Sequence, residues 1–309
     1  MFQTAFDNIS LLVICMIIGF AARRGGVLSS KDTPALSSVL VNITLPALMI
    51  VSMQREFDPY LFRHSIFAMA AAAILHILAF ALGVFLTKLL KSVDSEKIVF
   101  VFSLTFPNMG FMGIPVIYAI YGADAMFYTA MINSVFNVAL LTLGIYIMMG
   151  IGSGGQGISL KSVLLNKLII ATFTGFFLFA FSIRLPEVLG SGLSMVAGIT
   201  TPLSMIIIGS ILAENNLKTA FKGFKIYIIV LFRLIIFPLM MFFALRLIIT
   251  DPAMLTTLTI LSAMPVAAIT AIFAAQYDKE PGLASRMVFI STVLSLFTIP
   301  LMVTIIEMF

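Results

Sequence analysis

The chain has 309 residues, of which 61% are hydrophobic and only 10% are charged, and its net charge is +5. Soluble domains carry roughly 25% charged residues, so this composition excludes a soluble globular protein and indicates helices within a lipid bilayer. The single cysteine excludes a disulfide scaffold, and the two histidines lack acidic neighbours, so we expect no metal and no cofactor. No basic patch interleaved with aromatic residues points to nucleic acid.

Apolar runs of roughly 17–25 residues predict membrane-spanning helices. Ten such runs follow one another along the chain, at 6–22, 36–53, 65–87, 98–120, 125–149, 165–183, 192–213, 226–248, 255–276 and 285–307. Arg23 and Arg24 follow the first run instead of preceding it, which argues against a cleavable signal peptide. The fourth and ninth runs are compatible with whole spans or with pairs of half-helices.

The distribution of Lys and Arg between alternate loops predicts the orientation. Four lie on one side, namely Arg55, Arg63, Arg184 and Arg246. Thirteen lie on the other, namely Arg23, Arg24, Lys31, Lys88, Lys91, Lys97, Lys161, Lys167, Lys218, Lys222, Lys225, Lys279 and Arg286. Cytoplasmic loops carry the excess, so we expect both termini outside a bacterial inner (plasma) membrane and the loop near 150–164 inside.

A Gly/Ser-rich segment near the midpoint divides the chain into two halves of five predicted spans. The halves are 1–150 and 165–309, with 151–164 as a cytoplasmic linker. At an offset of 156 residues, identical residues recur at 43/199, 44/200, 46/202, 49/205, 50/206, 121/277 and 142/298. Two copies of a five-span unit must have opposite topologies, so the sequence predicts an inverted repeat, a signature of secondary transporters.

The fourth predicted span contains "TFPNMGFMGIPVI" (105–117), in which two prolines and two glycines oppose a continuous helix. Breaks are expected at Pro107-Asn108-Met109-Gly110 and at Gly113-Ile114-Pro115, with Pro115 as the first residue of a second half-helix. The ninth span carries "SAMPVAAITA" (262–271), with Pro265 as its single proline. Two half-helices that start in mid-membrane would direct two positive helix ends at one point, which favours a carboxylate anion.

Few polar side chains lie within the predicted spans. All 13 Asp and Glu residues fall in loops or near span ends, which argues against a cation as the substrate. Asn108 is the expected substrate contact, because its amide can donate to a carboxylate. Asn133 and Asn137 share one helix face, and they either line the same cavity or make interhelical hydrogen bonds. Arg233 either snorkels to the cytoplasmic face or binds ligand. His76 is either a packing residue, which is the commoner role of such a histidine, or a proton carrier.

The stretch "FPNMGFMGIPVIYAIYG" (106–122) resembles the fourth-span motif of the auxin efflux carrier family, which includes plant PIN exporters and bacterial malate and malonate permeases. The resemblance implies an all-α fold in which spans 1, 2, 6 and 7 form a scaffold. Spans 3–5 and 8–10 would form an elevator-type transport domain with broken, crossing spans 4 and 9. It carries Pro107, Asn108 and Pro265 over as site residues and makes Val266 the symmetry mate of Asn108.

We therefore predict a secondary transporter of small carboxylate anions that works by alternating access, as a monomer or homodimer. The candidate substrate-binding residues are Pro107, Asn108, Met109, Gly110, Gly113, Pro115, Asn133, Asn137, Pro265 and Val266. Two alternatives remain: a sodium-coupled carrier of larger amphipathic anions, like the bile-acid transporters, and an anion sensor that transports nothing. No nucleophile, metal cluster or paired carboxylate suggests an enzyme.

Overall fold

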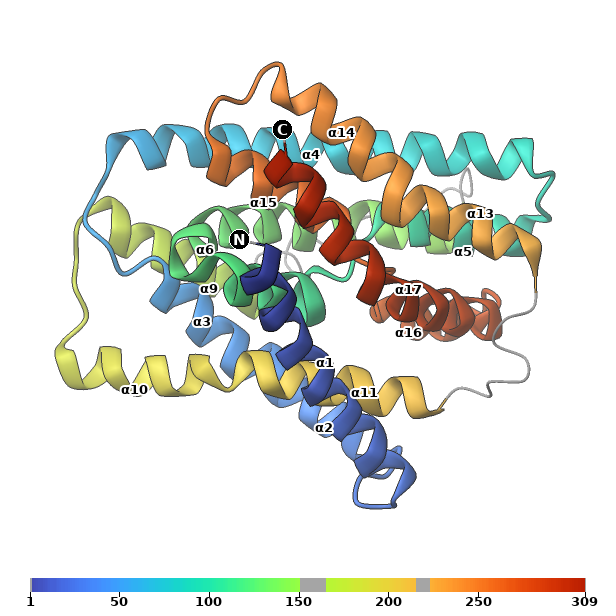
Figure 1. The fold of residues 1–309 in the computed structure, drawn as a ribbon, viewed down its shortest axis with the longest axis horizontal. Helices are drawn as coiled ribbons and strands as arrows, with labels where there is room; N and C mark the ends of the chain where they lie inside the picture. The colour runs from blue at the N-terminus through green and yellow to red at the C-terminus, as the bar shows by residue number, and fades with distance from the viewer. Residues whose placement is uncertain (1, 151–164, 215–222, 309) are drawn as a thin grey trace.

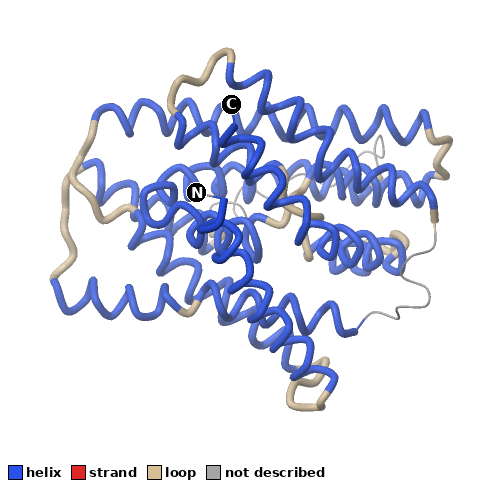
Figure 2. Tube along the Cα trace, viewed as in Figure 1, coloured by secondary structure: helices blue, strands red, loops and turns tan. Residues whose placement is uncertain are grey.

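The computed structural model describes residues 2–150, 165–214 and 223–308. All the regular structure in these ranges is helical, and Figure 2 shows helices joined by loops. The predicted linker, 151–164, lies outside the described residues.

The first half consists of α-helices, some of which are joined by short π-helical turns (η). In chain order these are α1 (Phe2–Arg24), α2 (Asp32–Val39), η1 (Leu40–Thr44), α3 (Leu45–Ser52), α4 (Pro59–Leu89), α5 (Asp94–Thr105), η2 (Met109–Gly113), α6 (Ile114–Ala139), η3 (Leu140–Gly144) and α7 (Ile145–Met149). Within α6, Gly122 has φ +67° and ψ −156°, a conformation that favours glycine, and it separates Met109–Gly122 from Ala125–Met149.

The second half also combines short helices, one helix with a π-helical turn and a long final helix. It comprises α9 (Lys167–Ala180), α10 (Glu187–Gly198), α11 (Thr200–Glu214), α13 (Phe224–Leu231), η4 (Phe232–Ile236), α14 (Phe237–Arg246), α15 (Pro252–Ser262), α16 (Ile269–Gln276) and α17 (Pro281–Met308). Figure 1 shows α4 and the α10–α11 pair along opposite edges of the molecule, with α6 and α15 between them.

The long apolar helices are those of an integral membrane protein. Among the described residues, six helical stretches are long and apolar enough to cross a membrane: Asp32–Ser52, Pro59–Leu89, Ala125–Met149, Glu187–Ala213, Phe224–Arg246 and Pro281–Met308. Three shorter apolar helices are Met109–Gly122, Lys167–Ala180 and Pro252–Ser262. Described helices occupy parts of all ten predicted ranges, but length and composition identify six spans, so the tenfold crossing stays a prediction.

Three of the π-helical turns lie immediately before prolines. Pro46, Pro115 and Pro238 each stand two residues after the last residue of η1, η2 and η4. A proline inside an α-helix removes one hydrogen bond and clashes with the carbonyl four residues earlier. A π turn widens the helix by one residue at that place, so the chain remains helical in an apolar environment where a broken backbone would be costly.

Two helix pairs pack through glycines at very close range. A Cβ atom on Gly19 of α1 would overlap the backbone of Ile206 in α11, and Figure 1 shows these two helices crossing. In the second pair, a Cβ atom on Gly175 of α9 would lie 3.3 Å from the Cα atom of Ile50 in α3. Small residues allow helix backbones to approach in this way, which favours association within lipid.

We expect Gly19→Ala to separate α1 from α11 and to cost about 1–3 kcal/mol of stability, the usual penalty for overpacking. The matched control is Gly192→Ala in α10, where an added Cβ atom meets nothing within 4 Å. Thermal unfolding in detergent, followed by size-exclusion chromatography, should show a lower midpoint for the first variant only. Equal midpoints for the two variants would contradict the close-packing argument.

Candidate anion site at the helix crossover

Two helical segments far apart in the sequence stop beside each other in the protein interior. Helix α5 ends at Thr105 and helical structure resumes at Met109, whereas α15 ends at Ser262 and α16 begins at Ile269. The intervening residues 106–108 and 263–267 are buried. Backbone polar groups in such a place must find partners within the protein.

The two interruptions satisfy each other. Pro107 and Val266 form an isolated antiparallel β-bridge. The N–H group of Asn108 donates to the carbonyl of Pro265 at 2.7 Å, and the N–H group of Ala267 donates to the carbonyl of Phe106 at 3.1 Å. Across this bridge Asn108 faces Pro265. The residue that occupies the equivalent place to Asn108 in the reciprocal exchange is Ala267, one residue after the Val266 expected from the sequence, because the bridge and not the proline positions sets the register.

The second expected interruption, at Gly113-Ile114-Pro115, is not present. Gly113 and Ile114 have helical dihedral angles, and Pro115 lies in the first turn of α6, directly continuous with η2. The half-helix therefore starts at Met109, six residues before Pro115. Gly113 serves close packing instead, because a Cβ atom there would lie 2.8 Å from the Cδ2 atom of Leu261 in α15.

The start of the second half-helix presents backbone donors to the crossover. The N–H groups of Met112 and Gly113 donate to the carbonyl of Asn108 at 3.3 and 2.9 Å, whereas those of Gly110 and Phe111 have no acceptor among the described residues. The Asn108 side chain is 3% exposed and does not cap the helix. Unpaired donors and the positive end of the helix dipole together favour a bound anion.

The opposite, negative helix ends are neutralised by Arg233 in η4. Its guanidinium group donates to the carbonyls of Leu104, Ser262 and Met264, which lie at the C-terminal ends of α5 and α15. The side chain is 1% exposed, so snorkelling to the cytoplasmic face is wrong. A cation stabilises the C-terminal ends of helices, and this arrangement leaves the positive N-terminal ends as the uncompensated ones at the crossover.

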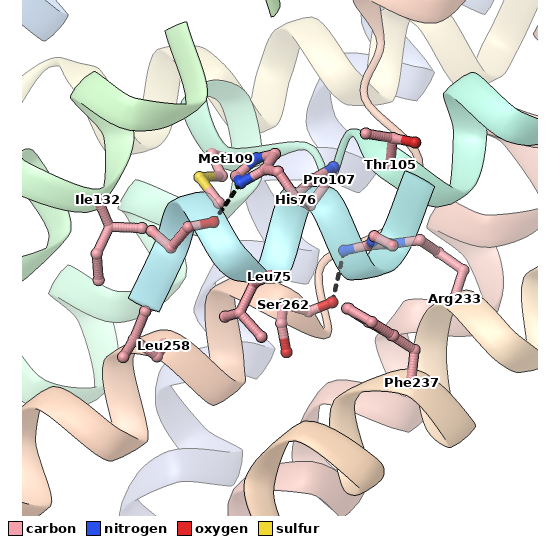
Figure 3. A pocket seen from close by; sticks show the side chains of 12 residues that line it. Leu75, His76, Thr105, Pro107, Met109, Ile132, Arg233, Phe237, Leu258 and Ser262 are labelled. Atoms are coloured by element: carbon pink, nitrogen blue, oxygen red, sulfur yellow. Dashed lines mark hydrogen bonds between the residues drawn. The ribbon is translucent and has the colours of Figure 1, made fainter. Parts of the chain in front are cut away.

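A small cavity of about 20 Å³ adjoins the crossover, enough for about one water molecule. Figure 3 shows His76, Pro107 and Met109 on one of its sides, and Arg233 with its hydrogen bond to Ser262 on another. Asn108 does not line this cavity, although both of its neighbours in sequence do.

Two predicted site residues lie apart from the crossover bridge, on α6. The Nδ2 atom of Asn137 donates to the backbone carbonyl of Asn133 at 2.8 Å, so this amide serves its own helix. The Nδ2 atom of Asn133 is buried and has no partner. Neither residue lines the small cavity, whereas the adjacent Ile132 does.

Two hydroxyl residues near the crossover were not identified from the sequence. Thr270 lies in the first turn of α16, is fully buried, and its hydroxyl has no hydrogen-bond partner. Ser291 of α17 accepts the N–H group of Val266 at 3.0 Å. Thr270 lies within the segment 262–271, five residues after Pro265. A hydroxyl residue so soon after the predicted break is the sequence feature that could have identified it as a site residue.

Comparison with known proteins identifies transporters. Residues 4–303 match the family model described as "Membrane transport protein". An "Uncharacterized transporter MJ1031" of Methanocaldococcus jannaschii is 24% identical over 302 residues, which cover 96% of each chain. An "Uncharacterized transporter" of Methanothermobacter thermautotrophicus is 24% identical over 315 residues, with 97% and 98% covered. A "Putative malonate transporter" of Rhizobium meliloti is 26% identical over 274 residues, with 85% of this chain and 84% of the relative covered.

The family model spans nearly the whole chain, including both crossover segments, five of the six long apolar helices in full and the sixth up to residue 303. These matches agree with the membrane-protein composition and indicate a transporter and not an enzyme. The chain belongs to the membrane transport protein family that comprises the auxin efflux carriers.

Proposed function

We propose that this protein is a secondary transporter of small carboxylate anions, with ten spans in a five-plus-five inverted repeat and an elevator-type mechanism. The observation that carries the proposal is the crossover, where two interrupted helices pair at Pro107 and Val266 in the buried interior. Helix N-terminal ends meet there, while Arg233 compensates the C-terminal ends. A small anion is the ligand that this distribution of partial charges favours.

Repeated packing contacts support the inverted repeat. Gly19 packs against the backbone of Ile206, and Gly175 packs against that of Ile50. The two glycines are 175 − 19 = 156 residues apart, and the two isoleucines are 206 − 50 = 156 residues apart. This is the offset at which the two halves of the sequence match. In each half, therefore, a glycine of the first helix packs against the second helix of the other half.

Polar contacts between distant elements support a division into scaffold and transport domain. Within the proposed scaffold, Thr33 bonds with Ser210, and Arg184 donates to the carbonyl of Gln54. Elements of the proposed transport domain are joined by three further sets of bonds: Lys225 to Glu96, Tyr128 to Asp251, and Arg233 to the crossover helices.

The surface between the two groups includes an apolar region rich in methionine. Leu12, Met16 and Met205 of the scaffold face Met112 and Ile299 of the transport domain around one narrow cavity. Apolar side chains, and flexible methionines in particular, can exchange neighbours without breaking directional bonds. Such a surface suits sliding of one domain along the other.

A larger cavity of about 240 Å³ lies between α3 and α10 of the scaffold and α6 of the transport domain. Arg55, on the side with few basic residues, lines it together with Leu48 and Tyr118. Leu45 lies one turn before Leu48 in α3. Its Cδ1 atom is 3.8 Å from the place that a Cβ atom on Gly110 would take, and Gly110 lies at the start of the half-helix. We take this cavity as the outer vestibule from which an anion reaches the crossover.

Reconstitution into liposomes tests the proposal. We expect saturable uptake of radiolabelled malonate, competed by other small mono- and dicarboxylates and absent from protein-free liposomes. Malonate is the probe because a relative carries that substrate in its name. Binding without flux would identify an anion sensor, and sodium-dependent uptake of taurocholate in place of malonate would identify a carrier of larger amphipathic anions. Either result would overturn the proposal.

A further inference from the structure

We propose that His76 is the proton-binding site that couples transport of the anion to a proton gradient, so that one proton moves with each anion. This inference rests on the proposed carrier function and adds the coupling ion to it. His76 lies in α4, is 5% exposed, and lines the small cavity beside Pro107 and Met109 (Figure 3).

The hydrogen bonds of His76 leave one ring nitrogen available. Its Nδ1 atom lies 2.7 Å from the carbonyl of Ala72, one turn earlier in α4, and a carbonyl only accepts, so Nδ1 carries a hydrogen. The Nε2 atom is buried and has no hydrogen-bond partner. In the neutral ring this atom holds a lone pair, so it can take up a proton from a water molecule in the cavity.

The surroundings of His76 make proton binding depend on an anion. The elements that pack around the ring contribute Phe106, Phe136, Met109 and Ser262, and Arg233 is the one charged residue among those lining the cavity. No carboxylate lines it. A second positive charge beside Arg233 is therefore unfavourable unless a negative charge lies close by, at the crossover.

Linkage makes this dependence reciprocal. If a bound anion favours the protonated imidazole, a protonated imidazole must favour the bound anion by the same factor. The spans contain no carboxylate that could act as an alternative proton carrier: the 13 Asp and Glu residues lie in loops or near span ends. His76 lies beside Pro107 and Met109, and the proposed anion site is at the same segment of the crossover. Movement of the crossover would therefore carry the proton and the anion together.

The test compares His76→Gln with wild type and with His64→Gln in proteoliposomes. His64 lies on the same helix, in its first two turns, stacked on Tyr60, and serves as the matched control. We expect an inward proton gradient to drive malonate accumulation in wild type and in the His64 variant. Under the same gradient, His76→Gln should accumulate at least ten-fold less malonate than wild type. It should retain malonate–malonate exchange, which needs no net proton movement.

Gradient-driven accumulation at the wild-type level in His76→Gln would overturn the proposal. If His76→Gln loses exchange as well, or if wild type does not transport malonate, NMR of ring-labelled histidine in the wild-type protein decides independently of flux. The His76 signal, assigned by its absence from the His76→Gln spectrum, should titrate reversibly in the presence of a saturating small carboxylate, and at a higher pH than in its absence. A signal that does not titrate refutes the proton site, whereas a failure of malonate transport alone refutes only the proposed substrate.

Discussion

Replacement of Asn108 by alanine is expected to abolish uptake of the carboxylate substrate while leaving the fold intact. The Asn108 backbone already makes its crossover bonds, to Pro265 and from Gly113, and alanine can make the same bonds. The side chain does not cap the half-helix, so its removal costs the folded state little. The amide is thus free to serve the ligand, and its loss leaves a carboxylate without a directed donor.

The measurement is initial uptake into proteoliposomes together with thermal unfolding in detergent. Asn42→Ala is the matched control, because the Asn42 amide bonds to Ser38 on an exposed turn of its own helix. We expect a fall of at least 100-fold for Asn108→Ala, an unfolding midpoint close to that of wild type, and near-normal uptake for Asn42→Ala. Unchanged transport kinetics in Asn108→Ala would remove this residue from the site.

Replacement of Arg233 by glutamine is expected to destabilise the protein severely. One guanidinium group satisfies three buried carbonyls, those of Leu104, Ser262 and Met264, at the ends of two helices. Hydrogen bonds to charged groups contribute about 1.5–3 kcal/mol each, and loss of a buried charged partner costs roughly 3–5 kcal/mol. Glutamine cannot reach all three acceptors, so we expect a loss of about 3–5 kcal/mol.

Unfolding by dodecyl sulfate, with reactivity of the single cysteine Cys15 as the probe, would measure this loss. Arg233→Lys should lie between wild type and glutamine, because an ammonium group keeps the charge but not the planar fork. Arg286→Gln is the control, since Arg286 is half-buried and donates to Gly282 of its own helix. Wild-type stability in Arg233→Gln would show that the two helix ends do not depend on this side chain.

The apolar composition and the positions of the prolines predicted much of the architecture. The apolar runs predicted helices, and described helices occupy parts of all ten runs. Unpaired backbone groups are costly in hydrocarbon, and a helix pairs its own backbone groups within one segment. Gly19 and Gly175, which are 156 residues apart, pack against Ile206 and Ile50; the inverted repeat itself stays a prediction. Near Pro115 the sequence was misleading, because η2 accommodates this proline within a continuous helix.

The sequence by itself determined the class of protein, its helical segments and the place of the first interruption, since these follow from composition and from the local preferences of proline and glycine. Only the tertiary structure decided the pairing of Asn108 with Pro265, the inward direction of Arg233 and the free nitrogen of His76. The physical reason is that these depend on hydrogen bonds between different helices, from 29 to 129 positions apart for Arg233, or on the absence of such a bond. Local patterns in a sequence do not specify which buried donor finds which acceptor.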